Sequence, residues 1–114
     1  MKKAVRFQDV LADSEPPQRL ALFALLNLGV IESLANGMLS AGDAVRLFFH
    51  SDNCLFVRRH LQDKLADQLM SRGVQLPDLF EALAREVAHR EFHRELATMR
   101  SLCLKLLENQ RRVA

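Results

Sequence analysis

Apolar residues recur at three- and four-residue intervals along most of this chain, which is the spacing of one face of an α-helix. The pattern covers residues 16–36, 41–50, 53–72 and 77–112. Residues 1–13 fit either a short helix or an extended arm. The pattern therefore predicts an all-α fold, a compact array of four or five helices that is either bundle-like or orthogonal.

Residues that start and stop helices lie between these segments. Two prolines open the first segment, where a helix tolerates them, and Gly37 is a typical residue after a helix end. Ser40 and Asp43 have the spacing of a capping box, with Asp in place of the usual Glu. We expect the third helix to end at Gly73 and the last segment to begin at Pro77.

The last segment allows two arrangements. A continuous helix over 77–112 would be about 54 Å long, whereas a compact domain of this length is roughly 35 Å across. The apolar stripe also changes register between Val87 and Phe92. One arrangement therefore bends the chain at 88–91. The other is a long C-terminal helix whose second half packs on a second copy of the chain through Phe92, Leu96, Met99 and Leu106.

The first segment is apolar almost all round, which predicts a helix at the centre of the array. Asn27 and Glu32 are then the polar residues expected to be buried, where each needs a partner. They would fix the register between helices or line a pocket. The longest apolar run, 20–31, is too short to cross a bilayer, so we expect a core helix and no membrane partner.

Length and composition favour one domain over residues 1–114, with 49% hydrophobic residues and neither Trp nor Tyr. The 16 basic and 14 acidic residues are spread evenly. Nucleic-acid binders concentrate basic charge on one face, so the charge argues against such a partner. With no export signal at the N-terminus, the chain is expected to be cytoplasmic. Cys54 and Cys103 are then reduced, buried thiols, although a disulfide between them stays open.

One cluster has metal-ligand chemistry. His89 and His93 are four residues apart, so a helix presents both imidazoles on one face. Glu86 completes a Glu-x-x-His unit, the spacing used in helical di-iron sites. Such sites need a second unit and two more carboxylates, and the His-Glu-x-x-His order of metalloproteases is not met. A solvated helix face with ion pairs is the favoured interpretation.

No catalytic constellation or glycine-rich phosphate loop stands out, so the sequence predicts a non-catalytic protein without a cofactor. The leading hypothesis is a protein–protein interaction or regulatory module, whose partner is another protein or a second copy. A metal- or small-ligand-binding bundle using His89 and His93 is the alternative. A DNA-binding regulator is third, from the helix–turn–helix outline of 51–64, where Asp63 and Asp67 would repel phosphates.

Overall fold

A computed structural model describes residues 6–113 of the chain, and six helices lie in this part. The all-α prediction and the long C-terminal helix are confirmed. Of the two possibilities for residues 1–13, a short helix is found over Phe7–Ala12, and residues 1–5 lie outside the described part of the chain. The helices are α1 (Phe7–Ala12), α2 (Pro16–Ala35), α3 (Ala41–Leu47), α4 (Ser51–His60), α5 (Lys64–Ala82) and α6 (Arg85–Val113).

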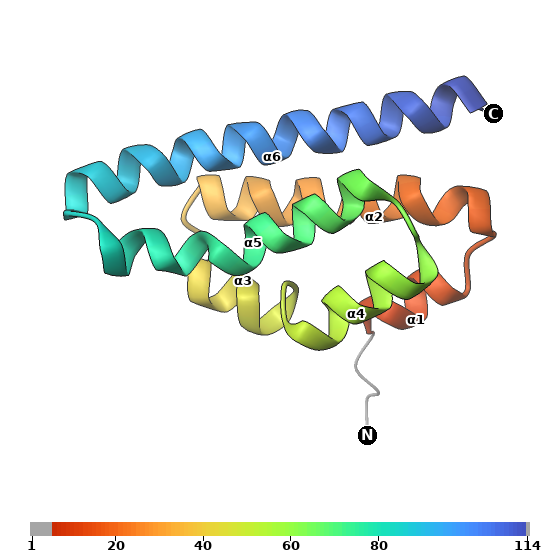
Figure 1. Ribbon diagram of the computed structural model, residues 1–114, viewed down its shortest axis with the longest axis horizontal. Coiled ribbons are helices and arrows are strands. Elements are labelled where there is room, and N and C mark those ends of the chain that lie inside the picture. The colour runs from red at the N-terminus through yellow and green to blue at the C-terminus, as the bar shows by residue number, and fades with distance from the viewer. Residues whose placement is uncertain (1–5, 114) are drawn as a thin grey trace.

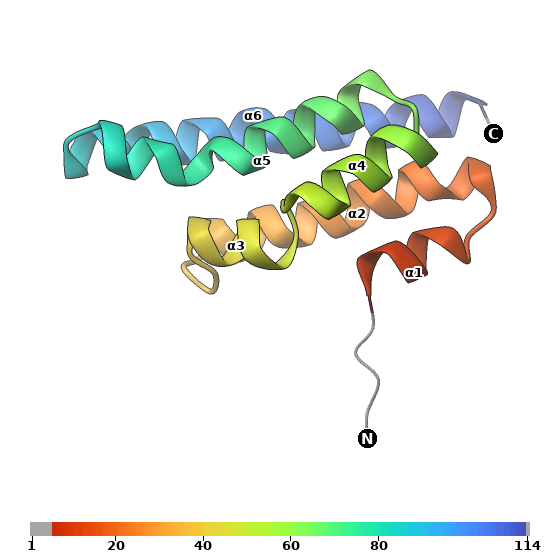
Figure 2. The same cartoon turned by 60° about the horizontal axis from the view of Figure 1, so that its bottom comes forward.

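The helices form three layers (Figures 1 and 2). α5 and α6 make an antiparallel hairpin, and α6 lies along both α2 and α5, which form the middle layer. α1, α3 and α4 cover the side of that layer that faces away from α6. The 29 residues of α6 span about 43 Å at 1.5 Å per residue. This helix therefore sets the longest dimension of the molecule, 44 Å.

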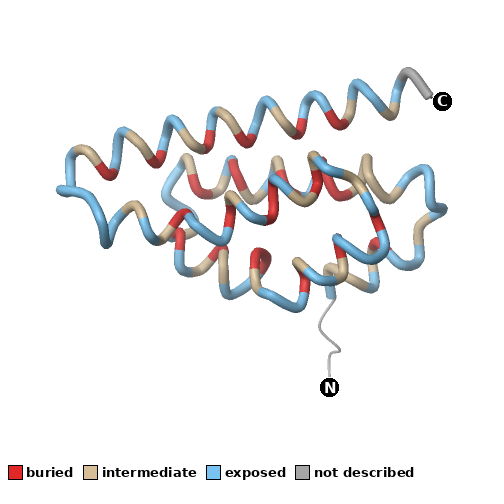
Figure 3. Tube along the Cα trace, in the orientation of Figure 1, coloured by how far each residue is buried: buried red, intermediate tan, exposed pale blue. Residues whose placement is uncertain are grey.

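Buried residues recur along α6 from Ala88 to Leu106 and face the other helices (Figure 3). Phe92, Leu96, Met99 and Leu106 are each at most 5% exposed within the single chain. The prediction that these four residues form a dimer face is therefore wrong. Their regular spacing does mark a helix-packing seam, but α2 and α5 of the same chain fill it.

The predicted third helix is two helices, because the chain turns at residues 61–63. Gln62 has a left-handed backbone with φ 50°. Asp63 then caps α5, since its Oδ1 accepts the backbone N–H groups of Leu65 and Ala66 at 2.9 and 3.1 Å. A short Asx cap of this kind satisfies donors that a helix start leaves free. The helical spacing of apolar residues continues across this turn, so the sequence pattern does not indicate it.

α5 does not end at Gly73, and Pro77 lies inside it rather than at a helix start. Gly73 is buried, and a Cβ atom there would collide with the ring of Phe49. Packing thus explains this glycine, not a helix end. Pro77 removes one helical hydrogen bond, a cost of about 3 kcal/mol, and the burial of neighbours such as Leu69 and Leu76 offsets it.

The turn between α5 and α6 lies earlier than the predicted bend. Leu83 has an extended backbone, with φ −119° and ψ 154°, and ends α5. α6 begins at Arg85 and passes through 88–91 without a break, so the bend expected there is wrong. The register change of the stripe is only apparent, because Phe80 and Leu83 precede the turn and, within α6, Ala88 rather than Val87 is the buried residue four positions before Phe92.

α2 matches its prediction in part. Asn27 is fully buried as expected, but Glu32 is exposed, and its Oε2 lies 3.1 Å from Nη2 of Arg100 on α6. The helix lies in the middle layer, yet its outer face is left open to solvent at Leu25 and Leu26. By length and composition α2 could also cross a membrane, a test that core helices of soluble proteins pass too.

Replacing Gly73 with Ala should destabilise the fold by about 1–3 kcal/mol, because the added methyl group must displace the ring of Phe49 from a packed core. Urea denaturation followed by far-ultraviolet circular dichroism measures this change in the free energy of unfolding.

Gly29→Ala is the matched control. Gly29 is also inside a helix, but among the described residues nothing beyond its chain neighbours and the nearby backbone of its own helix lies within 4 Å of a Cβ built there. Alanine should therefore stabilise the helix by about 0.5–1 kcal/mol. Equal effects of the two substitutions would show that the Phe49 contact does not matter.

Candidate functional site

An apolar groove lies where the α5–α6 hairpin extends past the ends of α2 and α3 (Figure 1). We call it the hairpin groove; its volume is about 530 Å³. The α2–α3 loop and the start of α3 form one wall, and the end of α5 with the start of α6 forms the other. It is lined by Leu34, Gly37, Leu39, Ser40, Ala41, Gly42, Pro77, Phe80, Glu81, His89 and Phe92.

Hydrogen bonds fix the loop wall of the groove. Gly37 has φ 75°, and the N–H groups of Gly37 and Met38 bind back to the carbonyls of Leu34 and Ser33. This is the Schellman arrangement that ends a helix. The predicted capping box of Ser40 and Asp43 is confirmed. The loop is therefore held at both ends.

Asp43 closes that capping box. The backbone N–H of Ser40 donates to its carboxylate at 3.2 Å, and the N–H of Asp43 donates to Oγ of Ser40 at 3.0 Å. Hydrogen bonding of the Asp43 carboxylate by the backbone and side chain of Ser40, followed by the charge of Arg46, holds the pKa of Asp43 below its usual value. The hydroxyl of Ser40 is thus already engaged within the chain.

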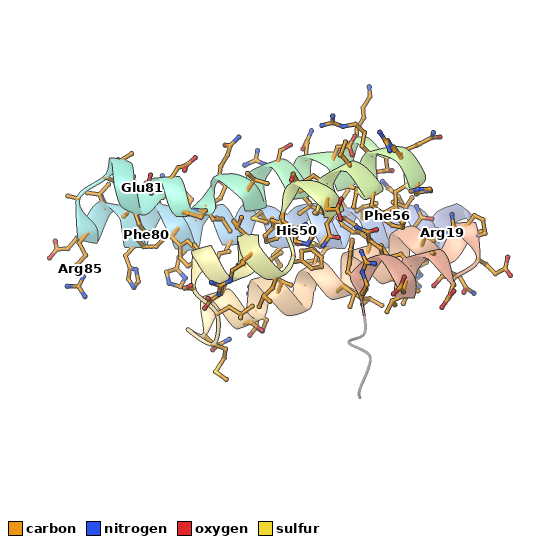
Figure 4. All side chains as sticks on the ribbon, turned by 90° about the horizontal axis from the view of Figure 1, so that it is seen from below. Arg19, His50, Phe56, Phe80, Glu81 and Arg85 are labelled. Carbon is orange, nitrogen blue, oxygen red and sulfur yellow. The ribbon has the colours of Figure 1, made fainter. Side chains whose placement is uncertain are left out.

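The hairpin wall is aromatic. The ring of Phe80 meets that of Phe92 edge-on, with centroids 5.1 Å apart, and that of His89 at 6.3 Å. Phe92 is buried, whereas Phe80 is 43% exposed. Figure 4 shows Phe80 beside Glu81 near the tip of the hairpin, far from Arg19 and Phe56. α2 and α3 end before the tip of the hairpin, which explains why no helix fully covers Phe80.

The three candidate metal ligands lie on α6 near this groove. His89 and His93 are both exposed, and their ring centroids are 5.5 Å apart. Glu86 is exposed one turn earlier. Within residues 6–113, no group of three His, Cys, Asp or Glu side chains is placed to hold a metal ion. The two-histidine site stays a prediction.

A second groove, of about 590 Å³, lies between α5 and α6 on another side of the hairpin. Its walls include the ion pair between Arg72 Nη1 and Glu95 Oε1, 2.6 Å apart, and the carboxylates of Asp78 and Glu91. Although larger, it is far more polar than the hairpin groove. It has no exposed aromatic ring among its lining residues.

Asn53 is a buried polar residue that the sequence analysis missed. Its Nδ2 donates to the carbonyl of Phe48 at 2.9 Å, and its Oδ1 accepts from Gln8 Nε2 at 3.0 Å. Its backbone N–H donates to Nδ1 of His50, which caps α4. The contact with Gln8 joins residues 45 positions apart.

Asn27 differs from Asn53, because neither its Oδ1 nor its Nδ2 has a hydrogen-bond partner among the described residues. An unsatisfied buried amide costs about 1–3 kcal/mol. It lies away from the hairpin groove and contributes nothing to its lining.

Comparison with known proteins gives no relative: no family model, no curated protein and no solved structure matches this chain. The function must therefore be argued from the geometry of the grooves and surfaces.

Asn27→Leu should raise the free energy of unfolding by about 1–3 kcal/mol, because it removes an unpaired buried amide and keeps a branched side chain of similar shape. Equilibrium denaturation in urea measures it. Asn53→Leu serves as the comparison and should destabilise the fold, since it leaves the Phe48 carbonyl and Gln8 unpaired. A loss of stability in Asn27→Leu would mean that this amide is satisfied.

The two cysteines, both free thiols, should differ in reactivity. Burial raises the pKa of Cys103 to about 12, and burial also raises that of the partly exposed Cys54. Only the thiolate reacts with iodoacetamide. At about pH 8 the Cys54 thiol of the folded protein should therefore be alkylated at least about tenfold faster than the Cys103 thiol. Mass spectrometry of labelled peptides follows both. In urea the rates should converge, and equal rates in the folded protein would contradict the burial of Cys103.

Proposed function

We propose that this protein is a protein-binding module whose hairpin groove receives the apolar face of a helix from another protein. The observation that carries this proposal is the exposed ring of Phe80 on the wall of an apolar groove. Exposed apolar surface of this kind is costly in water, and it usually marks a place where another surface binds. Inter-helix grooves commonly accept amphipathic helices.

The polar groups of the groove favour a protein partner over a small ligand. Small-molecule sites combine apolar walls with several converging polar groups that fix the ligand. In the hairpin groove the hydroxyl of Ser40 is used within the capping box. Glu81 and His89 lie on the hairpin wall, and the rest of the lining is apolar or glycine. The apolar side chains of a bound helix need no further polar partners in the groove.

The same residues indicate the chemistry of the partner. Glu81 is exposed and forms no ion pair within residues 6–113. A lysine or arginine beside the apolar face of the bound helix would meet this carboxylate at the edge of the groove. We therefore expect a helix with apolar residues at three- and four-residue spacing and a basic residue at its flank.

Photo-cross-linking tests the proposal. A photoreactive phenylalanine analogue replaces Phe80 in the full chain, expressed in the native host, and cross-linked adducts are identified by mass spectrometry. A discrete adduct is expected, with the attachment point in a helix of the partner. The matched control places the same analogue at Leu55 of α4, which is 44% exposed and lies outside the groove.

The identified partner segment then provides an affinity measurement. Phe80→Ser should weaken its binding by about tenfold or more, because a buried aromatic anchor is lost, whereas Leu55→Ser should leave the affinity unchanged. Fluorescence anisotropy of the labelled segment gives both values. Identical adducts at positions 80 and 55, or equal affinities of the two serine variants, would disprove the role of the groove.

A further inference from the structure

Two of the four histidines form a pair on the exposed side of α6. His89 and His93 are one helical turn apart, and both side chains are exposed. Their rings are nearly perpendicular, with centroids 5.5 Å apart. The other two histidines have other roles, since Nδ1 of His50 caps α4 and the ring of His60 packs against that of Phe56.

The nitrogen atoms of the pair are not used within the described part of the chain. Among residues 6–113, neither imidazole forms a hydrogen bond or an ion pair. Besides each other, they contact aromatic rings: His89 meets Phe80 and His93 meets Phe92, with centroids 6.3 and 5.6 Å apart. Neutral imidazole is the commonest metal ligand among protein side chains. Both rings therefore have nitrogen lone pairs available for an ion.

The separation of the two rings fits one ion between them. Zinc–nitrogen bonds are about 2.1 Å long, so two imidazoles bound to one ion at tetrahedral angles have ring centres about 5 Å apart. The 5.5 Å of the pair is close to this value, and the spacing of four residues keeps both rings on one face of the helix. We propose that His89 and His93 together bind one divalent ion of a late first-row metal, such as Zn²⁺, Ni²⁺ or Cu²⁺.

The charges around the pair decide the class of ion. Glu86 is exposed one turn before His89, whereas Arg85 and Arg90 are also exposed nearby. Arg85 extends outward from the tip of the hairpin (Figure 4). With one carboxylate against two guanidinium groups, charge alone does not attract a cation here. Mg²⁺ and Ca²⁺ need oxygen ligands, whereas imidazole nitrogen suits zinc, nickel and copper. The bonds to nitrogen must therefore carry the binding.

The chain supplies two ligands and leaves the site open. Within the part that the structure describes, no third His, Cys, Asp or Glu side chain is placed to complete it. The ion therefore keeps coordination positions for water or for a donor on another molecule. His89 also lines the hairpin groove, so the ion lies at the edge of that groove. The site does not rest on the function proposed for the groove, because its binding is measured on the chain alone.

Isothermal titration calorimetry of the full chain, prepared without an affinity tag, tests the site with Zn²⁺ and with Mg²⁺ for comparison. The wild type should bind one Zn²⁺ ion and no Mg²⁺. His89→Ala and His93→Ala should each weaken Zn²⁺ binding by at least about tenfold, because the second imidazole binds within the same molecule at a high effective concentration. His60→Ala is the matched control. It removes an exposed histidine that has no second histidine one turn away, so the affinity should not change.

Moving one histidine by a single position tests the geometry. His93→Ala combined with Arg94→His keeps four histidines but turns the second imidazole by about 100° around the helix. Binding should stay as weak as in His93→Ala. The lost charge of Arg94 would by itself favour a cation, so it cannot cause weak binding. All the substituted residues are exposed, and circular dichroism checks that each variant is folded.

Several results would overturn the proposal. A wild type that binds no Zn²⁺ at concentrations up to about 1 mM excludes the site. Equal affinities of the wild type and His89→Ala would place the ion elsewhere, for example at the partly exposed Cys54. Full affinity in the variant with the moved histidine would show that the pairing of the imidazoles does not matter. One ion per two chains would show that the ion joins two copies instead of two imidazoles of one helix.

Discussion

Burial of one apolar stripe of α6 against α2 and α5 is the interaction on which the rest of the structure depends. Burying a large apolar side chain is worth roughly 2 kcal/mol, and the stripe supplies four of them, Phe92, Leu96, Met99 and Leu106. The ion pairs of Arg100 with Glu32 and of Glu95 with Arg72 lie on opposite flanks of it. Exposed pairs contribute only a few tenths of a kcal/mol each. These two ion pairs therefore add little to the stability that burial of the apolar stripe provides.

This packing also creates the groove. α6 and α5 need a turn at Leu83 to become antiparallel, whereas α2 already ends at Ala35 because Gly37 stops it. The hairpin is consequently longer than the layer beneath it (Figure 1). Its aromatic residues near the tip have no helix below them, and Phe80 stays partly in water. The mismatch of helix lengths thus positions the candidate site, and no loop insertion is required.

The sequence predicted well where the signal was local and less well where it depended on distant contacts. The helical periodicity, the Gly37 stop and the Ser40–Asp43 box are local, and each is found in the structure. Gly73 was misassigned because its partner is Phe49, 24 positions away, and glycine at a helix end looks the same in sequence. The seam of α6 was recognised as a packing face, but periodicity does not tell whether the partner belongs to the same chain.

Only single residues of the candidate groove could be identified from the sequence. His89 and Phe92 were singled out for metal binding and for dimer packing, and the structure shows them on one groove wall. The other wall comes from residues 34–42, which have no chemistry of their own to mark them. What makes them part of a site is their position under the hairpin. That position follows from how far α5 extends, which its internal Pro77 obscured.

α2 shows most clearly that some residues are not explained by the stability of the monomer. Gly29 costs about 1 kcal/mol relative to alanine in a helix and contacts nothing that would need its small size. Leu25 exposes more than half of its side chain. Departures from local optimality of this kind are expected at functional surfaces. The packing of the single chain therefore explains Gly73, whose small size the ring of Phe49 requires, but it does not explain Gly29 or the exposure of Leu25.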